Sequence, residues 1–104
     1  MTTQIQTIES ALLELRAASL ASHSDYEIRA TMEKYNLLFL GEKFNKIMSM
    51  ELVSTLKNYF SLEISHDELL KVIPTICDNL KMDLEELALA EKPGELAGYF
   101  IELH

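Results

Sequence analysis

The chain has 104 residues, of which 48% are hydrophobic and 25% are charged. This mixture is typical of a folded domain and is too apolar for a disordered chain. The single cysteine rules out a disulfide within the chain, and the longest runs of large apolar residues are about four long, far short of the roughly 20 that a membrane-spanning helix needs. The first ten residues contain no lysine or arginine, which is atypical of a secretion signal. We therefore expect one domain, residues 1–104, in the cytoplasm.

The charge is acidic and unevenly distributed. Nine lysines and arginines oppose seventeen aspartates and glutamates, for a formal net charge of −8, and nearly all of the excess lies after residue 50. Nucleic-acid affinity comes mainly from cations that displace phosphate counterions, so direct binding to DNA or RNA is disfavoured, as is an anionic membrane surface. The surplus of carboxylates indicates a partner with a basic surface, unless it serves solubility alone.

The first segment has helical periodicity. Its apolar residues recur at spacings of three and four, which places them on one side of a helix that we expect to end near residues 21–23. The residues of this stripe are Ile5, Ile8, Leu12 and Leu15. Leu13 and Leu20 lie off the stripe, so a second neighbour or a partner chain has to cover them, and a homodimer through this helix is one way to do so.

Two further helices are predicted from cap signals. Ser24 and Glu27 form a capping box, and the helix that follows is expected to end at Gly41, where a positive φ costs little. Its buried stripe would be Ile28, Met32, Tyr35 and Phe39. Ser49 can cap the next helix, whose buried face would be Leu52, Val53, Leu56, Tyr59 and Phe60.

Residues 60–64 alternate apolar and polar side chains, which is typical of a strand or an extended connector. Ser65 and Glu68 then form a second capping box, which opens the most strongly periodic helix of the chain. Pro74 lies inside this segment and is expected to kink the helix, because its ring clashes with the carbonyl four residues earlier.

The last quarter of the chain is also interpreted as mainly helical. Asp83 and Glu86 resemble a third cap before Leu84, Leu87 and Ala88, and a final helical turn follows Pro93-Gly94. In a competing interpretation, residues 99–103 are extended and pair with residues 60–64 as a small ribbon. The expected fold class is thus mainly α, a compact bundle of four to six short helices, with that two-stranded ribbon as an optional addition.

No catalytic or metal-binding constellation is visible. The three histidines are far apart in the sequence, and Cys77 would lie about 16 Å from His66 along a helix, so we expect the thiol in the core. Three glycines cannot form the phosphate-binding loops of nucleotide enzymes. The chain is therefore predicted to be no enzyme and to use no metal and no cofactor.

Residues 62–91 contain predicted helices of a length suited to a DNA-binding helix-turn-helix, with a turn near residues 81–83. A recognition helix needs hydrogen-bond donors and positive charge to enter the major groove. The segment after this turn instead carries Asp83, Glu85, Glu86 and Glu91. We interpret the C-terminal acidic residues as an exposed face that docks on a basic protein surface, or imitates nucleic-acid phosphate.

The leading hypothesis is a small acidic interaction protein, such as an inhibitor, an immunity protein or a phage-type regulatory protein, that binds a basic surface of a larger protein. Carboxylates would steer the encounter and exposed apolar residues would anchor it. The candidate partner-binding residues are Asp83, Glu85, Glu86, Glu91, Glu95, Leu13, Leu20, Met48 and Met50. The alternative is a small homodimeric helical transcriptional regulator.

Overall fold

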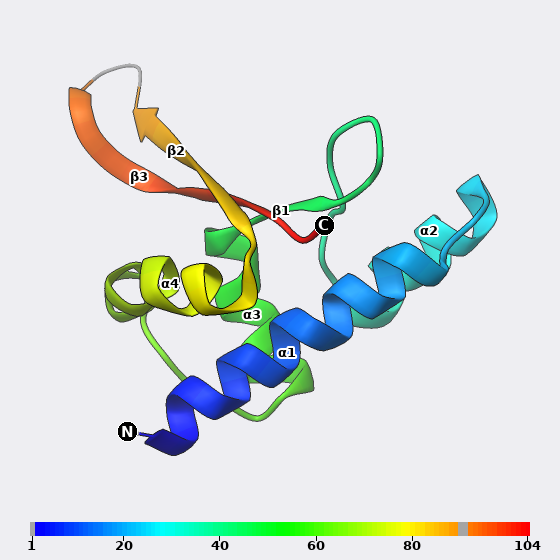
Figure 1. The fold of residues 1–104 in the computed structure, drawn as a ribbon, viewed down its shortest axis with the longest axis horizontal. Coiled ribbons are helices and arrows are strands. Elements are labelled where there is room, and N and C mark those ends of the chain that lie inside the picture. Colours follow the sequence, from blue (N-terminus) through cyan, green and yellow to red (C-terminus); the bar gives the residue numbers. More distant parts are fainter. Residues whose placement is uncertain (1, 90–91) are drawn as a thin grey trace.

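The computed structural model describes residues 2–89 and 92–104, which form four helices and three strands. In chain order the elements are α1 (Thr2–Ala21), α2 (Asp25–Tyr35), β1 (Lys46–Met48), α3 (Ser49–Tyr59), α4 (His66–Leu80), β2 (Asp83–Leu89) and β3 (Lys92–Glu102). The strands form one antiparallel sheet in the order β1-β3-β2, and the β2–β3 hairpin extends away from the helices (Figure 1). The predicted all-helical bundle is therefore wrong.

The cap signals predicted two helix starts correctly. The Ser24 hydroxyl accepts the Glu27 N–H at 3.1 Å, and the Ser65 hydroxyl accepts the Glu68 N–H at 3.1 Å. Each hydroxyl satisfies a backbone donor that the first helical turn leaves without a partner. Pro74 lies on the exposed side of α4, which continues as one helix from His66 to Leu80.

Two predicted helix boundaries were wrong, the end of α2 and the start of α3. Helix α2 ends at Tyr35, where Asn36 takes the left-handed conformation with φ 52° and its N–H bonds the Met32 carbonyl. Phe39 is buried but lies in the extended segment that follows, and Gly41 uses its φ of 85° in a turn after that segment. At α3 the N-cap is Met48, while Ser49 is the first helical residue and turns its side chain inward.

The predicted C-terminal helices are strands, and the physical reason is the sheet. Asp83 to Ala88 consists largely of good helix formers, but Leu84 packs against the core and pairs with Ile101 of β3. The β-branched and aromatic residues of β3 favour extended structure, and their burial outweighs the small local preference of β2. The competing interpretation was right that residues 99–102 are extended, but its ribbon is wrong, because these residues pair with β1 and β2 and residues 60–65 form a connector.

The core lies between one face of the sheet and the four helices. From α1 the residues Ile8, Leu12 and Leu15 are fully buried, as the predicted stripe requires, whereas Ile5 at its end is exposed. The other fully buried large side chains are Phe39, Ile47, Leu52, Leu56, Leu69, Ile73, Ile76, Ile101 and Leu103. Among the described residues, no helix combines the length and the apolar character needed to cross a bilayer.

The elements β1, α3, α4, β2 and β3 follow one another in the chain and form one unit, in which β3 lies between the other two strands. Helices α1 and α2 precede this unit, and α1 runs across the end of the molecule away from the hairpin (Figure 1). In the described part of residues 62–91, helix α4 is followed by β2, so the second helix expected after the turn near residues 81–83 is a strand.

Candidate functional site

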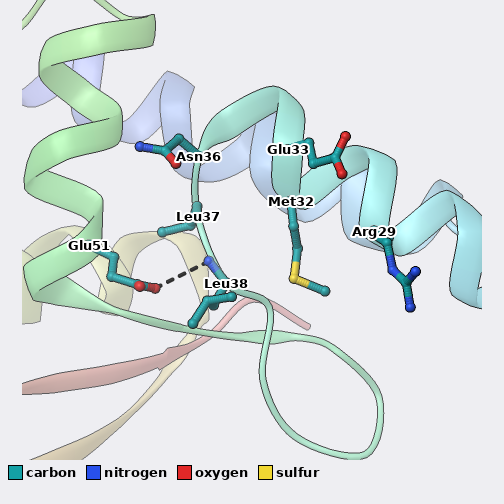
Figure 2. Close-up of a pocket in the computed structure, with 7 residues that line it drawn as sticks. All are labelled: Arg29, Met32, Glu33, Asn36, Leu37, Leu38 and Glu51. Carbon is teal, nitrogen blue, oxygen red and sulfur yellow. Dashed lines mark hydrogen bonds between the residues drawn. The ribbon is translucent and has the colours of Figure 1, made fainter.

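A surface hollow beside α2 has a volume of about 410 Å³. Its lining residues are Arg29, Met32, Glu33, Asn36, Leu37, Leu38 and Glu51. Figure 2 shows Arg29 and Met32 extending from α2 toward the same side, and Glu51 reaching from α3 to the backbone of Leu38. The Leu38 N–H donates to the Glu51 carboxylate at 3.2 Å, so this acidic group holds the segment after α2 in place.

The chemistry of this hollow is that of a shallow contact surface. Met32, Leu37 and Leu38 supply apolar area, and Arg29 and Glu33 place opposite charges on the rim. The lining contains no histidine, cysteine or hydroxyl side chain, and its ionisable groups are Arg29, Glu33 and Glu51. The hollow can accept an apolar group.

A second candidate surface is the face of the sheet that points away from the core, which we call the outer sheet face. Antiparallel register places Glu102 between Lys46 and Asp83, and Phe100 between Met48 and Glu85.

Directly paired residues share a face, so these six side chains lie together. Five of them, all but Met48, line a hollow of about 220 Å³ together with Leu84.

The outer sheet face has excess negative charge. It carries the carboxylates of Asp83, Glu85 and Glu102 and one cation, Lys46. In the described part of the chain the single ion pair within 4.0 Å joins Lys57 to Glu63, at 3.6 Å. The three carboxylates of the outer sheet face are therefore not neutralised at short range, and half-buried Phe100 adds apolar area between them.

The structure separates the predicted acidic residues. Asp83 and Glu85 share the outer sheet face, as residues two apart on a strand must. Glu86 is exposed but lies on the opposite face, next to Tyr99. Glu91 lies outside the described residues, and so does the side chain of Glu95.

The predicted apolar anchors are also separated. Leu13 and Leu20 are 39% and 53% exposed and lie on α1, which packs against α2 and α4 rather than beside the outer sheet face. Met50 is 57% exposed in the first turn of α3. Met48 is half-buried and is the one anchor that the register places on the outer sheet face, beside Phe100.

The partner-binding residues predicted from the sequence did not include three residues of the outer sheet face, Phe100, Lys46 and Glu102. Their proximity depends on the pairing of β3 with β1 and β2. The alternation of Met82, Asp83, Leu84 and Glu85 between apolar and acidic was a usable signal for β2, but it was assigned to a helix cap.

The reactive side chains serve the fold. Cys77 is 1% exposed, and its burial raises the pKa of the thiol to about 11, which makes it a poor nucleophile. Ser49 Oγ lies 2.9 Å from His66 Nε2 and accepts the Tyr99 N–H at 3.0 Å. Because Ser49 is itself buried, this pair fastens β3 to the starts of α3 and α4 rather than facing a substrate.

No metal centre is formed by the described residues, in which no group of three or more histidine, cysteine or carboxylate side chains converges. His104 Nε2 lies 3.0 Å from Ser19 Oγ, and His104 is far in sequence from His66. His23 is exposed in the turn between α1 and α2.

In comparisons with known proteins, the chain matched no family model, no curated protein and no solved structure.

Proposed function

We propose that this chain is a non-enzymatic interaction protein that binds a basic surface of a larger protein through its outer sheet face. An inhibitor, an immunity protein or a phage-type regulatory protein would act in this way. We place it in the cytoplasm, where a reduced thiol such as that of Cys77 is the normal state.

The observation that carries this proposal is the arrangement of Asp83, Glu85 and Glu102 around Phe100. Carboxylates that lack a short-range partner attract cationic groups and raise the rate of encounter. An aromatic ring at the centre of such a patch supplies contact area and can hold a lysine or arginine side chain over its face. The combination suits a basic protein surface better than it suits a small neutral ligand.

The charge of α4, the second helix of the α3–α4 pair, argues against duplex DNA as the partner. In a helix-turn-helix the second helix enters the major groove, and phosphate contacts need cations. The exposed polar residues of α4 are Asp67, Glu68, Lys71, Thr75, Asp78 and Asn79, which comprise three carboxylates and one cation. The charge of the exposed α4 residues therefore favours a protein partner over duplex DNA.

The second candidate function is a homodimeric transcriptional regulator that self-associates through α1. Leu13 and Leu20 favour it, because residues seven apart lie on one side of a helix and both are exposed. Light scattering of the purified chain and of Leu13→Glu tests the dimer, and a gel shift with random duplex at low salt tests DNA binding. A monomeric parent chain that shifts no duplex would remove this candidate.

The main proposal is tested by titrating the ¹⁵N-labelled chain with a lysine-rich peptide at low and at physiological salt. We expect shifts of the amides around Asp83, Glu85 and Phe100, and weaker binding as salt rises, because screening acts on exposed charges. The test variant is Asp83→Asn, Glu85→Gln and Glu102→Gln combined. The matched control removes the same number of charges elsewhere: Glu33→Gln, Asp67→Asn and Asp78→Asn.

Loss of binding in the test variant together with near-parental binding in the control would support the outer sheet face as the site. Equal weakening in both variants would mean that the peptide responds to net charge alone. In that case the excess of carboxylates serves solubility and the proposal is wrong.

A further inference from the structure

We propose that the free edge of β2 accepts an extended basic segment of the partner as a fourth strand of the sheet. This inference rests on the proposed function and specifies how the partner binds. The sheet order β1-β3-β2 leaves β2 at an edge, and the far part of the β2–β3 hairpin projects beyond the helices, whereas the start of β2 lies next to α4 (Figure 1).

The hydrogen-bond pattern identifies which backbone groups of β2 point outward. The Leu103 N–H donates to the Asn45 carbonyl on the β1 side of β3. Because successive residues of a strand bond to alternate sides, Phe100 and Glu102 bond toward β2. Their partners Glu85 and Asp83 therefore bond back to β3.

The N–H and C=O groups of Leu84 and Glu86 then point to the free edge. Within the described part of the chain, no hydrogen bond joins these groups to another segment. Met82, two residues before Leu84, directs its N–H to the same side of the strand, but this N–H donates to the Cys77 carbonyl at 2.8 Å. The free edge therefore begins after Met82. An added strand would find two successive residues of β2 with donors and acceptors available.

The side chains beside this edge determine the chemistry of the added strand. Asp83 and Glu85 flank it on the outer sheet face, and Leu84 and Glu86 flank it on the opposite face. A strand paired with Asp83–Glu86 meets, in that order, an acidic, an apolar and two acidic residues. Its complement is an extended segment with a cation, an apolar residue and two cations at the facing positions.

A second copy of this chain does not fit the same edge. If β2 paired with β2 of another molecule in antiparallel fashion, carboxylates of one strand would face carboxylates of the other across the new interface. Like charges directly opposite one another destabilise a strand pair, and charged residues on an edge are a common protection against self-pairing. The same carboxylates attract the cations of a basic strand, so the edge favours the basic partner proposed above over a second copy of the chain.

The test uses a short blocked peptide with the order Thr-Lys-Lys-Val-Lys-Thr, whose central four residues face Glu86 to Asp83 in an antiparallel pair. One derivative is N-methylated on the Val and on the Lys that faces Glu86, which removes the N–H groups directed at β2. The matched control derivative carries the same two methyl groups on the alternate residues, whose N–H groups point to solvent. Binding is measured by ¹⁵N titration, and hydrogen exchange is followed at the amides of Leu84 and Glu86.

We expect the first derivative to bind about tenfold or more weakly than the control derivative, since it loses two hydrogen bonds. The unmodified peptide should slow exchange at the amides of Leu84 and Glu86. Equal binding of both derivatives, with shifts confined to the outer sheet face, would overturn strand addition and leave the proposed function standing. If no basic peptide binds at all, the proposed function and this inference are both wrong.

A change in the protein itself gives a second test. Leu84→Pro removes an N–H that points outward, and proline is tolerated at such positions on an edge strand. Leu84→Val is the control, because it also shortens a partly buried side chain but keeps the N–H. We expect the proline variant to bind the unmodified peptide several-fold more weakly than the valine variant, and equal affinities would contradict the inference. If the proline variant fails to fold, the methylated peptides still decide.

Discussion

Gly98 is the residue of β3 at which one added carbon should be most disruptive. A Cβ built there would lie 2.8 Å from Ser49 Oγ, closer than real contacts allow, and 3.4 Å from His66 Cε1. Ser49 is 1% exposed and its hydroxyl bonds both His66 and the Tyr99 N–H, so it has no free space to move into. Gly98→Ala must therefore displace this hydroxyl.

The cost follows from the two hydrogen bonds that the displacement strains. Each contributes about 0.5–1.5 kcal/mol when formed, which gives about 1–3 kcal/mol for both. Replacing glycine with alanine also lowers the conformational entropy of the unfolded chain, which stabilises the folded state by roughly 0.5 kcal/mol. We expect Gly98→Ala to lower the free energy of unfolding by about 1.5 kcal/mol, as measured by urea denaturation followed by circular dichroism.

Ser49→Ala provides the control, because it removes the oxygen that the new Cβ would meet. In that background the further cost of Gly98→Ala should fall to roughly 0.5 kcal/mol or less, so a double-mutant cycle would give a coupling of about 1–2 kcal/mol between the two sites. If Gly98→Ala costs the same with and without the Ser49 hydroxyl, or leaves the parent chain as stable as before, this reasoning about the contact is wrong.

Three further predictions concern stability. Ser65→Ala should cost about 1 kcal/mol in urea denaturation, since it leaves the Glu68 N–H without its cap, and no loss would contradict the cap. Tyr35→Phe should cost about 1 kcal/mol through loss of the 2.7 Å hydrogen bond to Glu14, and Tyr35→Phe in a Glu14→Gln background should cost less. Burial raises the pKa of Cys77 from 9.0 to about 11, so the unfolded chain loses this proton first and the free energy of unfolding should fall as pH rises from about 9 to 11. Cys77→Ala should show a shallower fall over that range, and identical slopes would refute the assignment.

Helix starts could be predicted from the sequence because their signals are local. The hydroxyl of Ser24 or Ser65 bonds an N–H three residues ahead, so the residues that decide the start lie side by side in the chain. The buried stripe of α1 was predictable for a related reason. A helix has a fixed period, and Ile8, Leu12 and Leu15 fall on one side of it whatever they pack against.

The C-terminal strands could not be predicted from local signals in the same way. Asp83 to Leu89 has residues that favour a helix by themselves, and it becomes a strand because β3 offers it a partner and a core to cover. The outer sheet face likewise exists only through pairing: Glu102 meets Lys46 on one side and Asp83 on the other. No local pattern places these three residues together.

The sequence by itself determined the acidic balance of the chain, the absence of recognisable nucleotide-binding motifs, the starts of α2 and α4 and the buried side of α1. The tertiary structure decided that the last quarter is a hairpin, which carboxylates share a face, and that Ser49 holds Tyr99 across 50 residues of chain. The reason is the range of the forces involved. Caps and helical periodicity act within a few residues, whereas strand pairing and burial join segments whose proximity exists only after the chain has folded.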